Sequence, residues 1–143
     1  MSSVYIGRFA PSPSGRLHFG SLVAAVASYC DAKANNGKWL VRIEDVDGSR
    51  TVDGAADDIL RTLDCYGLHW DDEVVWQSQR ASLYEKVIQD LKSQGKAFDC
   101  ACTRKELEGS KLYPGFCRKG LPEGKDGRSV RFLTPVEDLV WND

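Results

Sequence analysis

Hydrophobic and polar positions along the chain alternate between patterns typical of strands and of helices. Short apolar runs predict strands at Val4–Phe9, Lys38–Glu44, Lys96–Cys102 and Ser129–Leu133. Apolar residues three or four positions apart predict helices at Gly20–Asn36, at Val52–Tyr66, and from Ser78 or Gln79 to about Gln94. A strand, a helix and a second strand in this order predict a right-handed βαβ unit with a parallel sheet.

Each predicted helix has an apolar face and recognisable ends. The residues expected to be buried are Leu22, Val23, Val26, Ala27 and Tyr29 on the first helix and Leu83, Val87, Ile88 and Leu91 on the third. Gly37 is expected in the left-handed position that ends the first helix, and Gly67 and Gly95 are expected to end the other two. The second helix is expected to begin at Thr51 or Asp53 as its N-cap. Cys30 and Cys65 lie on helical patterns and are expected to be buried.

Composition and charge limit the classes of protein to consider. A chain of 143 residues predicts one domain or a part of a larger one, and its net charge of -2 does not call for a nucleic-acid partner. The charge is uneven, because acidic residues dominate from 44 to 73 and basic residues from 104 to 131. The basic segment is either a solvated face or a functional patch. No apolar run approaches the roughly 20 residues that span a membrane, and no signal peptide is visible, so we expect a cytoplasmic protein that does not contact a membrane.

The loop after the first predicted strand is the strongest candidate for chemistry. It leads directly into a helix, whose free N–H groups and dipole favour an anion such as a phosphate. Hydrogen-bond donors are placed along it at Ser12, Ser14, His18 and Ser21. The segment Glu44-Asp45-Val46-Asp47 follows the second predicted strand. Since ligands of parallel sheets bind beyond the carboxyl ends of the strands, both segments are expected at one binding edge.

Three features of that edge suggest a substrate. The guanidinium of Arg8 suits a carboxylate, Glu44 suits an ammonium group, and the helix start near His18 suits a phosphate. An acidic amino acid beside ATP has all three groups. In the alternative interpretation, Arg8 and Glu44 form a structural ion pair and His18 is an ordinary loop histidine.

Three of the five cysteines are clustered. Cys100 and Cys102 are two apart on an extended segment, so their thiols face the same way, and Cys117 follows after a loop. Clustered cysteines in a reducing compartment favour zinc over a disulfide, and three free thiols are the alternative. Spacing leaves Asp99 and Tyr113 as local candidates for a fourth, oxygen ligand.

The same residues carry a family resemblance. The run Pro11-Ser12-Pro13-Ser14-Gly15-Arg16-Leu17-His18-Phe19-Gly20-Ser21 resembles the first ATP motif of class I aminoacyl-tRNA synthetases. The segments Arg8-Phe9-Ala10-Pro11-Ser12 and Leu40-Val41-Arg42-Ile43-Glu44-Asp45 resemble the glutamyl branch. Within that branch the chain is most similar to the glutamyl-queuosine tRNA(Asp) synthetases, short paralogues of glutamyl-tRNA synthetase, which have serine where Ser21 ends the motif. The resemblance extends to Gly67-Leu68-His69-Trp70-Asp71 and Trp76-Gln77-Ser78-Gln79-Arg80.

This resemblance implies a fold and an activity. It implies the first half of a Rossmann-like catalytic domain over residues 1–98, a zinc-binding insertion over 99–128 and the start of a further segment over 129–143. It implies that L-glutamate is activated by ATP with Mg²⁺ and transferred to queuosine in the anticodon of tRNA(Asp), by a monomer. Glutamate would contact Arg8, Phe9, Ala10, Pro11, Ser12 and Glu44. ATP would contact the motif from Pro11 to Ser21, with His18 and Ser21 as its catalytic residues.

The resemblance also assigns the metal ligands, and it implies a longer protein than this chain. In the family, one structural zinc is held by residues that correspond to Cys100, Cys102, Tyr113 and Cys117. The second ATP motif of class I synthetases does not occur in this sequence. We therefore expect a fragment that is not a competent enzyme alone. The N-terminal part of a glutamyl-tRNA synthetase and a non-catalytic, zinc-stabilised RNA-binding module are the alternatives.

Overall fold

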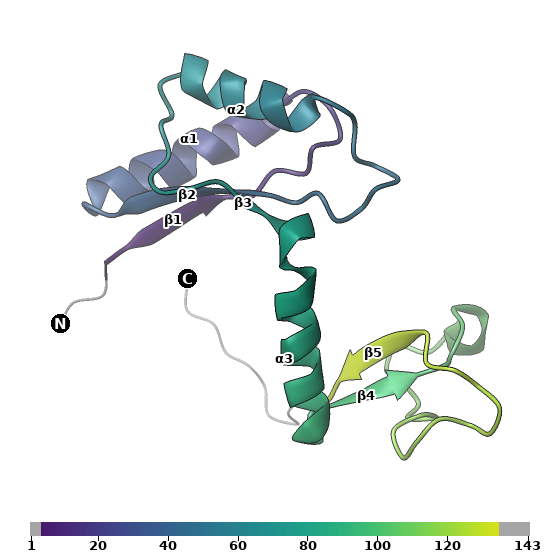
Figure 1. Cartoon of the computed structure of the whole chain (residues 1–143). Helices are drawn as coiled ribbons and strands as arrows, with labels where there is room; N and C mark the ends of the chain where they lie inside the picture. The colour runs from purple at the N-terminus through teal and green to yellow at the C-terminus, as the bar shows by residue number, and fades with distance from the viewer. Residues whose placement is uncertain (1–3, 135–143) are drawn as a thin grey trace. The chain divides into compact units, whose positions relative to one another are not determined.

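The computed structural model describes residues 4–134, which belong to two compact units (Figure 1). The N-terminal unit ends at Ala81 and the C-terminal unit begins at Ser82. The domain boundaries predicted above, at residues 98 and 128, stay predictions. Among the described residues, no helix combines the length and apolar character that crossing a membrane requires.

A parallel three-stranded sheet forms the frame of the N-terminal unit. Its strands are β1 (Ile6–Phe9), β2 (Lys38–Ile43) and β3 (Val75–Trp76), in the order β1-β2-β3. Helix α1 (Phe19–Ala34) connects β1 to β2, and helix α2 (Ala55–Cys65) lies between β2 and β3 in the chain. The parallel pairing of β1 with β2 confirms the predicted βαβ order. The short strand β3 was not predicted.

The core lies on one face of this sheet. Alternate residues of β2, namely Trp39, Val41 and Ile43, are fully buried, and both helices pack on that face (Figure 1). The indole N–H of Trp39 donates to the hydroxyl of Ser28 at 2.9 Å, so its polar atom is satisfied inside the core. The complete buried cluster contains Phe9, Ala25, Ala32, Trp39, Val41, Ile43, Ile59, Leu63 and Leu68.

The buried face of α1 differs from the predicted one. Its fully buried residues are Ala25 and Ala32, whereas Val23 and Val26 are exposed. The cause is a close approach of α1 to β1: a Cβ on Gly7 would lie 2.9 Å from the Cβ of Ala32 and 3.0 Å from the carbonyl oxygen of Ser28. Only small side chains fit between the two elements, and the larger apolar residues of the helix therefore cannot mark its buried face.

The end of α1 also differs. The left-handed residue is Asn36, with φ of 51°, and not Gly37 as predicted. Gly37 is required for another reason, because a Cβ there would lie 2.3 Å from the carbonyl oxygen of Tyr5. That oxygen accepts the N–H of Lys38 at 3.0 Å. The glycine thus permits the chain to enter β2 directly beside β1.

Helix α2 begins later than predicted. Its N-cap is Gly54, which has φ of 74° and makes no side-chain cap, so the predicted caps Thr51 and Asp53 are wrong. The negative charges of Asp57 and Asp58 in its first turn compensate the helix dipole instead. Gly67 has the left-handed conformation that was expected after this helix.

The two isolated cysteines of the N-terminal unit are on the surface. Cys30 on α1 and Cys65 on α2 are both exposed, which contradicts the prediction that they are buried. Each lies outside the stripe of its helix that faces the sheet, since that stripe contains Ala25 and Ala32 on α1 and Ile59 and Leu63 on α2.

In the C-terminal unit, a helix precedes a two-stranded antiparallel sheet. This helix is α3 (Ala81–Ser93), which follows the 3-10 helix η1 (Gln77–Arg80) of the N-terminal unit in the chain. In the sheet, β4 (Ala97–Cys100) pairs with β5 (Ser129–Phe132). No residue of α3 is buried, so the predicted core face of Leu83, Val87, Ile88 and Leu91 is wrong for the described part of the chain. Leu83 and Val87 are exposed, and Ile88 and Leu91 are half-buried. Gly95 ends the helix in the left-handed conformation, as expected.

A capping box orders the chain between β4 and β5. The N–H of Thr103 donates to the carboxylate of Glu106 at 2.7 Å, and the N–H of Glu106 donates to the hydroxyl of Thr103 at 3.2 Å. This capping box lies at the start of the short helix η2 (Lys105–Leu107). The Thr103 N–H and the Lys125 ammonium lower the pKa of Glu106 to about 2. The carboxylate therefore stays charged throughout the physiological pH range.

Candidate functional site

The segment from Pro11 to Ser21, which resembles the first ATP motif, leads into the start of α1. His18 is the N-cap: its Nδ1 accepts the N–H of Ser21 at 3.2 Å, and its Nε2 lies 3.1 Å from the Ser21 hydroxyl oxygen. Because Nδ1 accepts, the proton of a neutral imidazole is on Nε2, which donates to the hydroxyl. A Cβ on Gly20 would lie 3.2 Å from the imidazole, so glycine gives the ring its space. His18 and Ser21 thus form one hydrogen-bonded pair at the helix start.

This helix start suits an anion. The first N–H groups of a helix have no partner within the helix, and the Ser21 N–H is taken by His18, which leaves those of Phe19 and Gly20. The first turn carries no acidic residue. A hollow of about 450 Å³ opens here. It is lined by Phe9, Ala10, Pro11, Ser12, Ser14, Gly15, Arg16, Leu17, His18, Gly20, Ser21 and Ala24.

Two backbone hydrogen bonds join this loop to the segment that follows β2. The N–H of Glu44 donates to the carbonyl of Pro11 at 2.9 Å, and the N–H of Val52 donates to the carbonyl of Pro13 at 2.9 Å. Pro13 is fully buried between them. The loop after β1 and the chain after β2 are therefore held side by side, as the order of the strands led us to expect.

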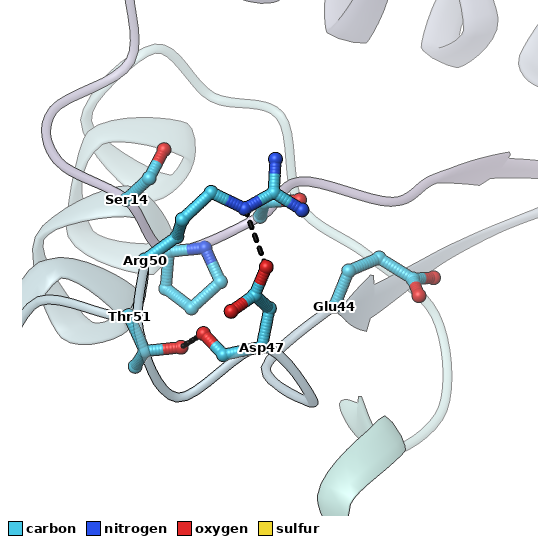
Figure 2. A pocket seen from close by; sticks show the side chains of 7 residues that line it. Ser14, Glu44, Asp47, Arg50 and Thr51 are labelled. Carbon is cyan, nitrogen blue, oxygen red and sulfur yellow. Dashed lines mark hydrogen bonds and ion pairs between the residues drawn. The ribbon is translucent and has the colours of Figure 1, made fainter. Parts of the chain in front are cut away.

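A second, narrow hollow forms where these segments meet (Figure 2). Its volume is about 30 Å³, and it is lined by Ser12, Pro13, Ser14, Glu44, Asp47, Arg50 and Thr51. The side chains of Arg50 and Glu44 stand on either side of Asp47 in Figure 2. Ser12 and Ser14 also line the larger hollow at the helix start, so the two hollows share a wall.

Asp47 organises the mouth of the narrow hollow. Its carboxylate accepts the Ser49 hydroxyl at 2.6 Å and the Nε of Arg50 at 2.6 Å, and these contacts lower its pKa. Its carbonyl accepts the N–H and the hydroxyl of Thr51, both at 3.0 Å. Sequence reasoning did not identify Arg50 and Thr51 as pocket residues. The signal was present, since an aspartate followed by Gly48 and Ser49 is typical of a side-chain-stabilised turn.

Arg8 and Glu44 are not paired with each other as the alternative interpretation required. The carboxylate of Glu44 accepts the Nε of Arg42 at 2.6 Å and the amide of Gln77 at 3.4 Å. Arg8 pairs with Leu40 in the register of β1 and β2, is exposed, and lines neither hollow. The structure therefore brings Ser12, Ser14 and Glu44 together but does not place Arg8 among them.

The clustered cysteines have the geometry of a metal site. The sulfur atoms of Cys100, Cys102 and Cys117 all lie within 4.8 Å of one another. The Tyr113 hydroxyl oxygen is 3.5 Å from the sulfur of Cys100 and 3.7 Å from that of Cys102, which is 3.7 Å from the sulfur of Cys117. Ligands at the corners of a tetrahedron with bonds of about 2.0–2.3 Å to zinc lie about 3.5–3.8 Å apart. The three distances given above lie in this range, so the group could hold a metal ion.

Of the two oxygen candidates, the structure places Tyr113 with the sulfurs. Asp99 instead pairs with the ammonium of Lys92 at 2.6 Å. Burial raises the pKa of the Cys100 thiol, but hydrogen bonds from Tyr113 and Arg131 outweigh it and lower the pKa to about 6. Burial and the hydrogen bond to Cys100 raise the pKa of Tyr113 above its ordinary value. The lowered pKa favours the thiolate form of Cys100 at neutral pH. The raised pKa of Tyr113 keeps its hydroxyl protonated unless a metal ion binds.

Comparison with known proteins assigns the chain to a family. Residues 5–115 match the family model described as "tRNA synthetases class I (E and Q), catalytic domain". The chain belongs to this class I synthetase family. This membership, together with the parallel sheet and its helices, confirms the predicted Rossmann-like fold class.

Relatives of this class I synthetase chain include two bacterial proteins named glutamyl-Q tRNA(Asp) synthetase. The protein from Aromatoleum aromaticum is 55% identical over 89% of this chain and 42% of its own length. The one from Dechloromonas aromatica is 54% identical over 100% of this chain and 50% of its own length. The chain thus spans about half the length of the curated relatives it matches.

Solved structures of class I synthetases agree with the fold. The glutamate-tRNA synthetase of Elizabethkingia anophelis matches 74% of this chain and 23% of its own, with 32% identity and a TM-score of 0.67. A glutamate tRNA ligase from Elizabethkingia meningosepticum, solved in complex with its amino acid, matches with 33% identity and a TM-score of 0.66 over 75% of this chain and 23% of its own. The roles of individual site residues stay predictions.

The cap at His18 makes a testable prediction about stability. His18→Ala removes both contacts to Ser21 and is expected to lower the free energy of unfolding by about 0.5–2 kcal/mol. His18→Asn keeps a side-chain acceptor at the N-cap and is expected to recover most of that loss. His69→Ala, at an exposed histidine outside the loop, is the matched control and should change the free energy by less than about 0.5 kcal/mol. Urea unfolding measures all three, and equal values for His18→Ala and wild type would contradict the cap.

Proposed function

We propose that the protein to which this chain belongs activates L-glutamate with ATP and transfers it to queuosine in the anticodon of tRNA(Asp). The observation that carries this proposal is the joining of the β1–α1 loop to Glu44, which places an anion-binding helix start beside a carboxylate that suits an ammonium group. Relatives named glutamyl-Q tRNA(Asp) synthetase, about 55% identical to this chain, support the choice of amino acid and acceptor.

Each substrate group has a proposed partner. Glu44 binds the ammonium group of glutamate, Arg8 binds a carboxylate, and the backbone of Phe9 to Ser12 forms the wall between them. The motif from Pro11 to Ser21 binds ATP, and the imidazole of His18 donates to a phosphate oxygen in place of the Ser21 hydroxyl. Ser21 is the residue that keeps this imidazole oriented, because its backbone N–H donates to Nδ1 at 3.2 Å.

The proposed reaction needs no nucleophile from the protein. An oxygen of the glutamate α-carboxylate attacks the α-phosphorus of ATP, a new P–O bond forms, and the bond to pyrophosphate breaks. The glutamyl group then passes to the acceptor nucleoside, and AMP leaves. Catalysis rests on positioning the two substrates and on stabilising negative charge at the phosphates, which the helix start and His18 supply. Mg²⁺ would accompany ATP through its phosphate oxygens.

We further propose a structural zinc held by Cys100, Cys102, Tyr113 and Cys117. With all four positions filled by protein, no site is left for a reacting water. The metal would fasten the end of β4 to the loop that carries Tyr113 and Cys117. It would thereby shape the basic segment from residue 104 to 131, which is suited to tRNA phosphates. Reduced thiols at such a site are in keeping with a cytoplasmic protein.

Pyrophosphate exchange on the full-length gene product tests the proposed activity. We expect glutamate-dependent exchange of label between pyrophosphate and ATP in the absence of tRNA. Glu44→Gln removes the charge opposite the ammonium group and should lower kcat/KM for glutamate about 10- to 100-fold, in line with the energy of a charged hydrogen bond. Glu73→Gln, at an exposed carboxylate that lines neither hollow, is the matched control and should leave exchange unchanged.

Two results would contradict the proposal in different ways. Exchange that requires tRNA would indicate an ordinary glutamyl-tRNA synthetase. Binding of tRNA by a protein that shows no exchange under any condition would indicate the RNA-binding module.

Metal analysis tests the zinc site. We expect one zinc per chain, and Cys102→Ser should lower the zinc content because it removes a thiolate next to Cys117 and Tyr113. Cys65→Ser, at an exposed cysteine of the N-terminal unit, should not change it. Zinc affinity should fall as the pH is lowered, because protons compete for the thiolates. Carefully purified wild-type protein with no bound zinc would contradict the site.

A further inference from the structure

We infer that Arg131 is a positioning residue for the cysteine and tyrosine cluster, and that its guanidinium holds two of the four ligands in place. This inference rests on the zinc site proposed above. Arg131 lies on β5, outside the segment that contains the four ligands, and it is distant from all of them in the sequence. The antiparallel pairing of β4 and β5 brings it to the cluster.

The strand register places Arg131 on the correct face. Arg131 is opposite Phe98, and Ser129 is opposite Cys100. Since side chains alternate along a strand, Phe98, Cys100 and Arg131 project from the same face of the sheet. Arg131 is therefore the diagonal neighbour of Cys100, within reach of a long side chain. A shift of the register by one residue would move it to the opposite face.

A single guanidinium contacts two proposed ligands. The Nε of Arg131 donates to the sulfur of Cys100 at 3.1 Å. Its Cζ lies 4.2 Å from the centroid of the Tyr113 ring, so the cation stacks on the aromatic face. Phe98 supports the same ring, at 5.8 Å between centroids. The Tyr113 ring thus contacts both the arginine and the phenylalanine, and its hydroxyl oxygen lies 3.5 Å and 3.7 Å from the sulfurs of Cys100 and Cys102.

The negative charge of the metal-bound cluster explains why a cation at Arg131 is favourable. Three thiolates and one phenolate around Zn²⁺ carry a net negative charge, which a neighbouring cation stabilises. The nearby cations Lys92 and Lys125 already pair with Asp99 and Glu106. Arg131 donates to the ligands themselves. Outer partners of this kind fix the orientation of metal ligands, and their removal typically costs 10- to 100-fold in metal affinity.

The chemistry of arginine is required at this position. Its planar guanidinium can donate from Nε to a sulfur while its face stacks on a ring. A lysine in its place keeps the charge but offers neither the planar face nor a donor fixed at that angle. The two substitutions therefore separate the contribution of charge from that of orientation.

The test measures metal retention by the full-length protein. Zinc is released to a coloured chelator, and cobalt is bound in its place to report the thiolates through their charge-transfer absorption. Arg131→Met should release zinc about 10- to 100-fold faster and shift the cobalt–thiolate band. Arg131→Lys should lie between Arg131→Met and wild type. Arg128→Met, at an exposed arginine of the same unit, is the matched control and should behave as wild type.

The outcomes separate this inference from the zinc proposal. A wild-type protein that binds neither zinc nor cobalt would overturn both. A wild type that binds zinc, with Arg131→Met equal to it in release rate and cobalt spectrum, would overturn the role of Arg131 alone. If Arg131→Met does not fold, Arg131→Lys decides by the same two readouts. A zinc release rate and a cobalt–thiolate band equal to those of wild type would count against the inference. Faster release with a shifted band would support it.

Discussion

The close contact between α1 and β1 is the constraint on which the N-terminal unit depends. At Gly7 there is no space for even a methyl group, because Ala32 and the Ser28 carbonyl already occupy it. The helix can therefore lie almost on the strand, with Trp39 of β2 packed beside them and its indole N–H bound to Ser28. This contact fixes how α1 lies on the sheet, and the cap at His18 then fixes where the helix begins.

The candidate site follows from that frame by short steps. The loop leaving β1 has to return to the start of α1, and on the way its carbonyls at Pro11 and Pro13 accept N–H groups from the chain after β2. Glu44 is brought to the loop through its own backbone, while Arg42 orients its side chain. Asp47 then stabilises the turn that follows through its hydrogen bonds to Ser49, Arg50 and Thr51, and this turn lines the narrow hollow beside Glu44. Backbone hydrogen bonds thus assemble the pocket, and side chains supply its chemistry.

The C-terminal unit is stabilised in a different way. Its two strands alone bury little, and a two-stranded sheet is marginally stable in water. Its buried cluster consists of Cys100, Ala101 and Cys117, with Phe98, Cys102 and Tyr113 packed against it. Four of these six residues are the proposed zinc ligands, so the site for the metal lies within this buried cluster. A metal there would supply the cohesion that a small apolar core does not.

The sequence predicted the elements better than their buried faces. Strands are short and bounded by turns, so β1, β2, β4 and β5 could be located from their pattern alone. The buried face of α1 could not, since close packing favours alanine and conceals the usual signal of large apolar residues. Gly37 was recognised as special but for the wrong reason, because a clash with the Tyr5 carbonyl depends on tertiary structure. Arg50 and Arg131 escaped notice because their partners are fixed by a turn and by a strand register.

The free energy of unfolding of Gly7→Ala tests the central constraint most directly. A methyl group at this position must push α1 from β1, and overpacking of this kind costs about 1–3 kcal/mol. Gly48→Ala is the matched comparison, because a Cβ there meets nothing within 4 Å. The account predicts that Gly7→Ala lowers the free energy of unfolding by about 1–3 kcal/mol, while Gly48→Ala leaves it unchanged or slightly higher. Equal stability of Gly7→Ala and wild type would contradict it.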